Sequence, residues 1–194
     1  MHQQILRPIR AKELTFPVDS MTVNGDKSYF TNNPQYHMYL HPEAPSHERL
    51  MESRDNVLAR YPELIMIGAH LGSLEWDVDV LAERLDLYPN FAVDMAARVC
   101  HFQVQDRQKV RNFILRYQDR LIYATDMSVS GDNFEGRKSR IENDWRSDWA
   151  YFATDSLLSS RKVDKEFEGL DLSEEVLRKI YYTNALTWYP GAFE

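Results

Sequence analysis

The chain has 194 residues, of which 43% are hydrophobic and 12% aromatic, a composition typical of a single soluble globular domain. Its formal net charge of −7 argues against a nucleic-acid partner, because affinity for phosphates depends on lysine and arginine. The single cysteine excludes an internal disulfide, and no apolar run approaches the roughly 18 residues that span a bilayer, so we expect one cytoplasmic domain over residues 1–194 with no membrane partner.

The first quarter of the chain is expected to be mostly extended loop. Five prolines interrupt residues 1–45, and Asn-Gly and Asn-Pro pairs in the same stretch signal turns. The next segment has helical periodicity. A helix is predicted over 47–60, because Ser46 can cap it and apolar residues recur at helical spacing until Pro62.

Three apolar runs that alternate with helical patterns are predicted to form parallel strands. Continuous apolar runs are typical of parallel strands that are covered on both faces. The strands are expected at 64–69, 91–94 and 121–125, with helices at 74–87 and 106–117 between them. This alternation predicts an α/β fold with right-handed crossovers.

The last third of the chain is predicted to be a polar loop followed by helices. Residues 131–140 are mostly polar and are interpreted as a loop, whereas aromatic residues at helical spacing predict a helix over 142–158. Ser173, followed by two glutamates, is expected to cap a final helix. No internal repeat or linker divides the chain.

His70 is the leading candidate for chemistry, because it follows the apolar run 65–69 directly and enters a glycine-containing turn. Side chains at the carboxyl ends of parallel strands face the mouth of a barrel or the crevice of an open sheet. A neutral imidazole there can bind a divalent metal or transfer protons. Leu71, Gly72 and Arg98 are expected to bind substrate beside it. The alternative for His70 is a hydrogen-bonded structural residue.

Asp126 is the second candidate, since it also follows an apolar strand and supplies a carboxylate at the same end of the sheet. A carboxylate and a histidine that face one space can bind a metal together or orient a water. Asp126 could instead cap a helix or form a turn. Asp94 ends the intermediate strand, either as an ion-pair partner of Arg98 or as a group on the substrate side.

Other chemically capable residues carry weaker signals. The spacing of His37, His41 and His47 fits no standard zinc arrangement, so a surface or packing role is expected for them. Cys100 and His101 are adjacent and point apart in a regular element, which argues against a nucleophilic pair. The sequence contains no glycine-rich phosphate loop, Gly-x-Ser-x-Gly elbow or dinucleotide fingerprint.

Several segments, in this order, resemble the carboxyl-terminal half of amidohydrolase-2-type metal-dependent hydrolases. These segments are 67–73, 85–94, 121–126 and the ending 172–185, and the resemblance covers roughly residues 34–190. It implies a (β/α)8 TIM barrel, of which this chain would hold about strands six to eight with their helices. It also implies a divalent metal, usually zinc, at the carboxyl-terminal mouth.

The resemblance assigns roles to both candidates. His70 corresponds to the sixth-strand histidine, a proton shuttle or metal ligand, and Asp126 to the eighth-strand aspartate that binds metal and helps to activate water. The family also begins with a His-x-His pair, which this sequence lacks, and His2 is a poor substitute. The ligand set is therefore expected to be incomplete, and the open sheet is expected to have exposed edges.

These observations leave three hypotheses for function. The first is hydrolysis of a small-molecule substrate by a metal-activated water, with the missing ligands supplied by a complementary amino-terminal chain or a second copy. The second is non-oxidative decarboxylation on the same scaffold. The third is a non-catalytic remnant that persists as an interaction module and buries its open sheet edge against another subunit.

Overall fold

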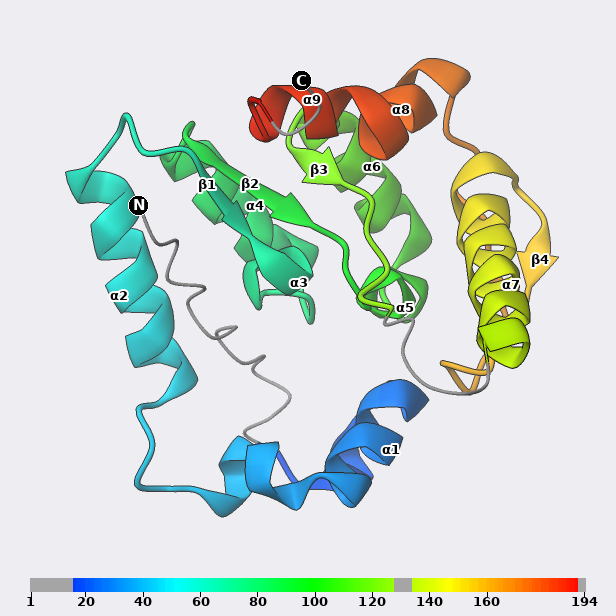
Figure 1. Ribbon diagram of the computed structural model, residues 1–194, viewed down its shortest axis with the longest axis horizontal. Coiled ribbons are helices and arrows are strands. Elements are labelled where there is room, and N and C mark those ends of the chain that lie inside the picture. The colour runs from blue at the N-terminus through cyan, green and yellow to red at the C-terminus, as the bar shows by residue number, and fades with distance from the viewer. Residues whose placement is uncertain (1–15, 128–133, 192–194) are drawn as a thin grey trace.

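The computed structural model describes residues 16–127 and 134–191 and is built on a parallel sheet (Figure 1). Its three strands are β1 (Met66–Gly68), β2 (Phe91–Asp94) and β3 (Leu121–Ile122), hydrogen-bonded in the order β1-β2-β3. Both pairings are parallel. The predicted α/β fold with a parallel sheet is therefore confirmed.

Helices carry the chain from each strand to the next. The segment α3 (Ala69–Gly72) and helix α4 (Val78–Leu87) join β1 to β2, and α5 (Val99–Gln103) and α6 (Arg107–Tyr117) join β2 to β3. Figure 1 shows α4 and α6 together on one face of the sheet. Because all three strands run in the same direction, their carboxyl ends share one edge of the sheet.

Local capping sets several helix starts. Ser46 Oγ accepts a hydrogen bond from the Arg49 N–H at 3.3 Å, and α2 (His47–Arg60) has the predicted bounds. Helix α6 starts where expected, because Asp106 accepts from the Lys109 N–H at 2.8 Å. Helix α4 begins four residues later than predicted, because Asp77 is its cap.

The prediction of extended loop over residues 1–45 is wrong for the part that the structure describes. Helix α1 occupies Asn24–Asn32, and 3-10 turns lie at Val18–Ser20, Pro34–Tyr36 and Met38–Leu40. Of the prolines in the described part of this stretch, Pro17, Pro42 and Pro45 lie outside these elements and Pro34 is at the first position of a turn. Proline is tolerated there because the first N–H groups of a helix have no internal partner.

The predicted loop over 131–140 is wrong from residue 134 onward, while residues 128–133 lie outside the described part of the chain. Helix α7 spans Phe134–Ala153. Its first turns are polar because most of them face solvent, which the sequence alone does not distinguish from a loop. The helix also ends before residue 158, and a short antiparallel pair follows, β4 (Leu157–Leu158) with β5 (Phe167–Glu168).

The carboxyl-terminal helices cover the outer edge of β3. They are α8 (Glu174–Arg178), a π-helical turn η5 (Lys179–Thr183) and α9 (Asn184–Trp188). The Tyr123 N–H donates to the Ile180 carbonyl at 2.9 Å, and Asn184 Nδ2 donates to the Leu121 carbonyl at 2.8 Å. The expectation of an exposed sheet edge is thus wrong on the outer side of β3, which bonds to these helices.

Beside β1, at the opposite side of the sheet, apolar side chains are exposed. Leu64 and Ile65, which lead into β1, are 43% and 52% exposed. The interior residues of the sheet, such as Phe91, Val93 and Leu121, have no exposed surface. No helix within the described ranges is both long enough and apolar enough to cross a membrane.

Phe91 offers a test of this core. Its ring is fully buried, and the Arg54 guanidinium carbon lies 4.9 Å from the ring centroid. Replacing Phe91 by alanine is expected to lower the free energy of unfolding by about 3–5 kcal/mol, because the lost ring leaves a cavity. Leu87→Ala is the control, since Leu87 is 67% exposed and should change stability little. Urea denaturation measures both, and equal effects would contradict the observed packing.

Candidate active site at the carboxyl edge of the sheet

The three strands deliver His70, Asp94 and Asp126 to one edge of the sheet. His70 lies two residues beyond β1, Asp94 is the last residue of β2, and Asp126 lies four residues beyond β3. Since β1 and β3 both pair with β2, His70 and Asp126 follow the two flanking strands with Asp94 between them. The sequence predicts both residues directly after their strands, at 64–69 and 121–125, whereas β3 ends at Ile122 and Asp126 lies farther beyond it than predicted.

The backbone after β1 forms a left-handed turn. His70, Leu71, Gly72 and Ser73 have φ angles of 58°, 54°, 62° and 60°. Only one of these residues is glycine, although the left-handed region costs an L-residue roughly 1–2 kcal/mol. Four such residues in succession require contacts from elsewhere to hold them.

Positive φ angles concentrate at this edge. Six non-glycine residues in the described ranges have them, and five of the six follow the parallel strands. These five are His70, Leu71, Ser73, Ala97 and Asp126. Strained backbone gathers at functional sites more often than elsewhere, so this distribution marks the carboxyl edge as the candidate site.

Asp94 fastens the ends of β1 and β2 together. Its Oδ1 accepts hydrogen bonds from the His70 N–H at 2.9 Å and from the Ala96 N–H at 3.0 Å. Of the two predicted roles for Asp94, the ion pair with Arg98 is wrong. Asp94 instead binds backbone, and the charged acceptor strengthens both bonds.

Helix α2 holds the far end of the left-handed turn. Arg54 Nη1 donates to the Gly72 carbonyl at 2.6 Å, and His47 Nε2 donates to the Ser73 carbonyl at 2.9 Å. Arg54 and His47 are only 7% and 3% exposed. Neither residue was predicted to support the site. The sequence does contain a signal for Arg54, because it lies four residues from both Leu50 and Leu58 and so falls on the apolar face of the helix.

The His70 ring is fixed in one tautomer. Nδ1 lies 2.7 Å from the Ala96 carbonyl, and because a carbonyl can only accept, Nδ1 carries the proton. In the neutral imidazole, Nε2 then carries the lone pair. A histidine held in this way is suited to accept a proton or to bind a metal ion.

Asp126 is exposed, with φ at 58°, and the His70 side chain is partly buried. Of the residues predicted to bind substrate, Leu71 and Gly72 are buried. Leu71 has no exposed surface, so its predicted contact with substrate is wrong, and the Gly72 carbonyl is occupied by Arg54.

Arg98 is also bound to an interior group. Its Nε donates to Glu75 Oε1 at 2.8 Å, and the Glu75 side chain is fully buried. Burial disfavours the charged guanidinium, but Glu75 and Asp26 together keep the pKa of Arg98 above its ordinary value. Arg98 therefore serves this ion pair, and the substrate-binding role predicted for it has no support in the geometry.

The described residues do not fit a complete metal centre. They contain no group of three histidine, cysteine, aspartate or glutamate side chains placed to hold an ion. A catalytic zinc needs three protein ligands, and His70 with Asp126 provide two at most. His2, the poor substitute for the missing His-x-His pair, lies outside the described residues.

The remaining histidines and the cysteine have structural surroundings. His37 Nε2 bonds to the Phe16 carbonyl at 2.8 Å, and His41 Nδ1 lies 3.2 Å from Glu43. Together with the buried His47, they match the predicted surface or packing role. Burial raises the pKa of the Cys100 thiol to about 12, which leaves it protonated and unsuited to act as a nucleophile.

Parallel strands with helical crossovers and a strained, histidine-bearing carboxyl edge define an α/β protein of the kind that includes many enzymes. A family model described as Amidohydrolase matches residues 10–191, and the chain belongs to this amidohydrolase family. No curated protein and no solved structure matches the chain. Membership of the family supports enzymatic activity of the hydrolase or lyase type.

Gly68 tests how tightly the turn is packed. A Cβ added at this position would lie 2.8 Å from the Phe91 ring and 2.9 Å from the Gly72 Cα. Gly68→Ala is expected to lower the free energy of unfolding by about 1–3 kcal/mol, because ring and turn must move apart. Gly25→Ala in α1 is the control, since its nearest atom is 3.9 Å away. Chemical denaturation of both variants measures the difference, and a neutral Gly68→Ala would contradict this packing.

His47 makes the stability of the turn depend on pH. Burial lowers its folded-state pKa below the ordinary 6.5, despite the hydrogen bond to Ser73. As pH falls below 6.5 the unfolded chain takes up a proton that the folded chain resists, so stability is full above 6.5 and declines below it. Urea denaturation between pH 7.5 and 5 should show this decline in the wild type and a smaller one in His47→Gln. A pH slope in His47→Gln identical to that of the wild type would count against the assignment.

Proposed function

We propose that this chain is a hydrolase of the amidohydrolase type that acts on small molecules at the carboxyl edge of its sheet. One observation carries the proposal: His70 lies on a strained left-handed turn that is held from two sides, and its Nδ1–H is committed to the Ala96 carbonyl. Strained backbone of this kind is typical of functional sites, where a reactive group must be placed accurately.

His70 would transfer the proton in the reaction. In the tautomer that is held here, Nε2 can accept a proton from an attacking water and then return it to the departing oxygen or nitrogen. Asp126 would orient that water or the substrate through its exposed carboxylate. Esters and lactones are the substrate classes that we favour, because both need one nucleophilic water and one proton shuttle.

The scaffold would be part of a (β/α)8 barrel, completed by a second chain. The uncovered side of β1, with Leu64 and Ile65 exposed beside it, is the place where further parallel strands could add. A complementary amino-terminal chain or another copy would also bring the metal-ligand donors that the described residues lack. The covered edge of β3 offers no such place.

Loss of the imidazole should abolish most turnover. His70→Asn is expected to lower kcat for hydrolysis of simple esters and lactones by roughly 10²–10⁴-fold, the usual contribution of general acid–base catalysis. Asp126→Asn should also lower it. A pH-stat assay measures the rate, and His41→Asn, which alters a histidine remote in sequence from the strand ends, should leave it unchanged.

Two results would count against the proposal. One is wild-type turnover that His70→Asn leaves intact. The other is release of carbon dioxide from aromatic or unsaturated acids with no hydrolysis of esters or lactones, which would assign the chain to the decarboxylase reaction instead. The assay is run on the chain alone and after mixing with any copurifying partner.

A further inference from the structure

A buried ion pair joins the two loops that follow β1 and β2. Glu75 comes shortly after the left-handed turn, and Arg98 is the residue before α5 in the loop after β2. Arg98 Nε donates to Glu75 Oε1 at 2.8 Å, and the two side chains are 17% and 0% exposed. The proposed reaction gives this pair no direct role.

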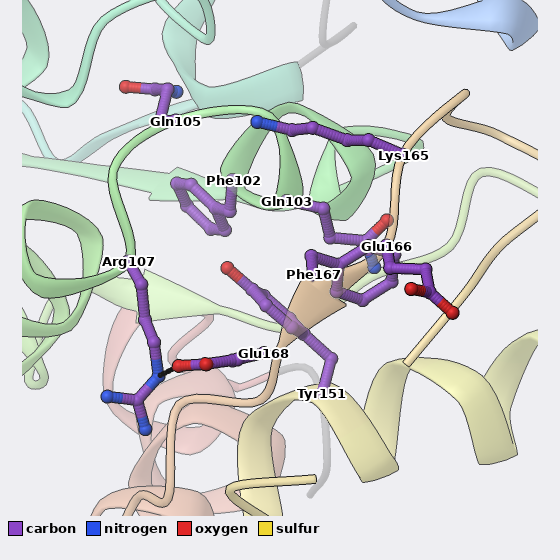
Figure 2. Close-up of a pocket in the computed structure, with 9 residues that line it drawn as sticks. All are labelled: Phe102, Gln103, Gln105, Arg107, Tyr151, Lys165, Glu166, Phe167 and Glu168. Atoms are coloured by element: carbon purple, nitrogen blue, oxygen red, sulfur yellow. Dashed lines mark ion pairs between the residues drawn. The ribbon is translucent and has the colours of Figure 1, made fainter. Parts of the chain in front are cut away.

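Burial separates this pair from the ion pairs at the surface. Figure 2 shows one of these, Arg107 with Glu168, at a pocket beside α7, where the side chains are 34% and 63% exposed. A buried pair must offset the lost hydration of both charges, so it is weak evidence for stability. Glu75 Oε2 is also buried without a hydrogen-bond partner in the described parts of the chain, which adds to the cost. Stability therefore does not explain why this pair lies inside.

Arg98 reaches the residue that directs the hydrogen-bond acceptor of His70. Its Nη1 donates to the Ala97 carbonyl at 3.3 Å, and Ala97 has a φ angle of 55°, which alanine rarely adopts. The planar peptide group between Ala96 and Ala97 turns with this angle, so the angle sets where the Ala96 carbonyl points. That carbonyl lies 2.7 Å from His70 Nδ1.

The Glu75 end of the pair has a firm base. Gln105 Nε2 donates to the Glu75 carbonyl at 2.9 Å and to the His101 carbonyl at 3.0 Å. Gln105 Oε1 accepts from the Val78 N–H at 3.0 Å. The backbone around Glu75 is thus fixed to the end of α5, and its carboxylate holds Arg98 from a fixed point.

We propose that Glu75 and Arg98 are positioning residues for His70. Their ion pair holds Ala97 in its left-handed conformation, which directs the Ala96 carbonyl at the imidazole and keeps the proton on Nδ1. The inference rests on the proposed function only in taking His70 as the group that transfers the proton. Both residues act through the loop and not on the reacting atoms.

Replacing both partners by methionine breaks the link without leaving one charge alone in the interior. The variant that combines Glu75→Met with Arg98→Met should keep a thermal midpoint near that of the wild type, because apolar groups of similar volume often replace a buried ion pair without loss. NMR chemical shifts of the His70 ring nitrogens, measured where the imidazole is neutral, report which nitrogen carries the proton. The ratio of the Nδ1–H to the Nε2–H tautomer should fall about fivefold, the usual effect of losing one hydrogen bond.

Three further variants separate this link from a general effect on the fold. Glu75→Gln retains an oxygen that accepts from Arg98 and should keep the wild-type tautomer ratio. Arg107→Met combined with Glu168→Met removes the exposed pair of Figure 2 and should also leave the ratio unchanged. Arg98→Lys keeps the charge beside Glu75 but lacks the planar fork that bonds Glu75 and Ala97 together, so it should lower the ratio. It provides the test if the double methionine variant at 75 and 98 does not fold.

Turnover is the second measurement. The double methionine variant should lower kcat for ester or lactone hydrolysis about tenfold or more and leave KM nearly unchanged, because it misplaces the proton-transfer group without altering substrate contacts. The tautomer ratio is measured without turnover. Failure of the proposed hydrolysis and failure of this inference are therefore distinguishable.

Two results overturn the proposal. One is a wild-type tautomer ratio at His70 in the folded double methionine variant, or in Arg98→Lys where the double variant does not fold. The other is an equal fall in the ratio when Arg107 and Glu168 are replaced, which would show that His70 responds to the loss of any ion pair.

Discussion

A single carboxylate oxygen organises the carboxyl edge of the sheet. Asp94 Oδ1 accepts from the first residue of the left-handed turn and from the loop that follows β2, so it links the ends of two adjacent strands. The Ala96 carbonyl in that same loop then receives the His70 ring. Backbone position and ring tautomer of His70 are therefore set by one short segment of β2, and a shift of that segment would disturb both.

The other support of the turn comes from a distant part of the sequence. Arg54 and His47 lie on α2, and their hydrogen bonds to Gly72 and Ser73 bring a helix from before the sheet against the first strand end. Both bonds form in a buried setting, and the bond from the charged Arg54 is of a kind worth about 1.5–3 kcal/mol. That is enough to offset much of the cost of four consecutive left-handed residues. Helix α2 is thus part of the site although none of its residues reaches the strand edge to react.

The two outer strands of the sheet differ in how far other parts of the chain cover them. At β3 the outward backbone groups are satisfied by the carboxyl-terminal helices. At β1 the approach to the strand keeps apolar side chains exposed. Within the described residues, no group of three potential ligand side chains is placed to hold a metal ion.

Much of the framework was determined locally by the sequence. Ser46 and Asp106 fixed the starts of α2 and α6, because a capping side chain acts within its own turn, and apolar runs placed the strands and hence His70 and Asp126. Only tertiary structure decided the rest. Leu71 is buried by what packs on it, Arg98 is paired with the buried Glu75, and the left-handed turn exists because Asp94, Arg54 and His47 reach it from other elements. The polar start of α7 is a helix for a similar reason: whether polar residues face solvent from a helix or a loop depends on what packs against them, and sequence periodicity contains no information on that.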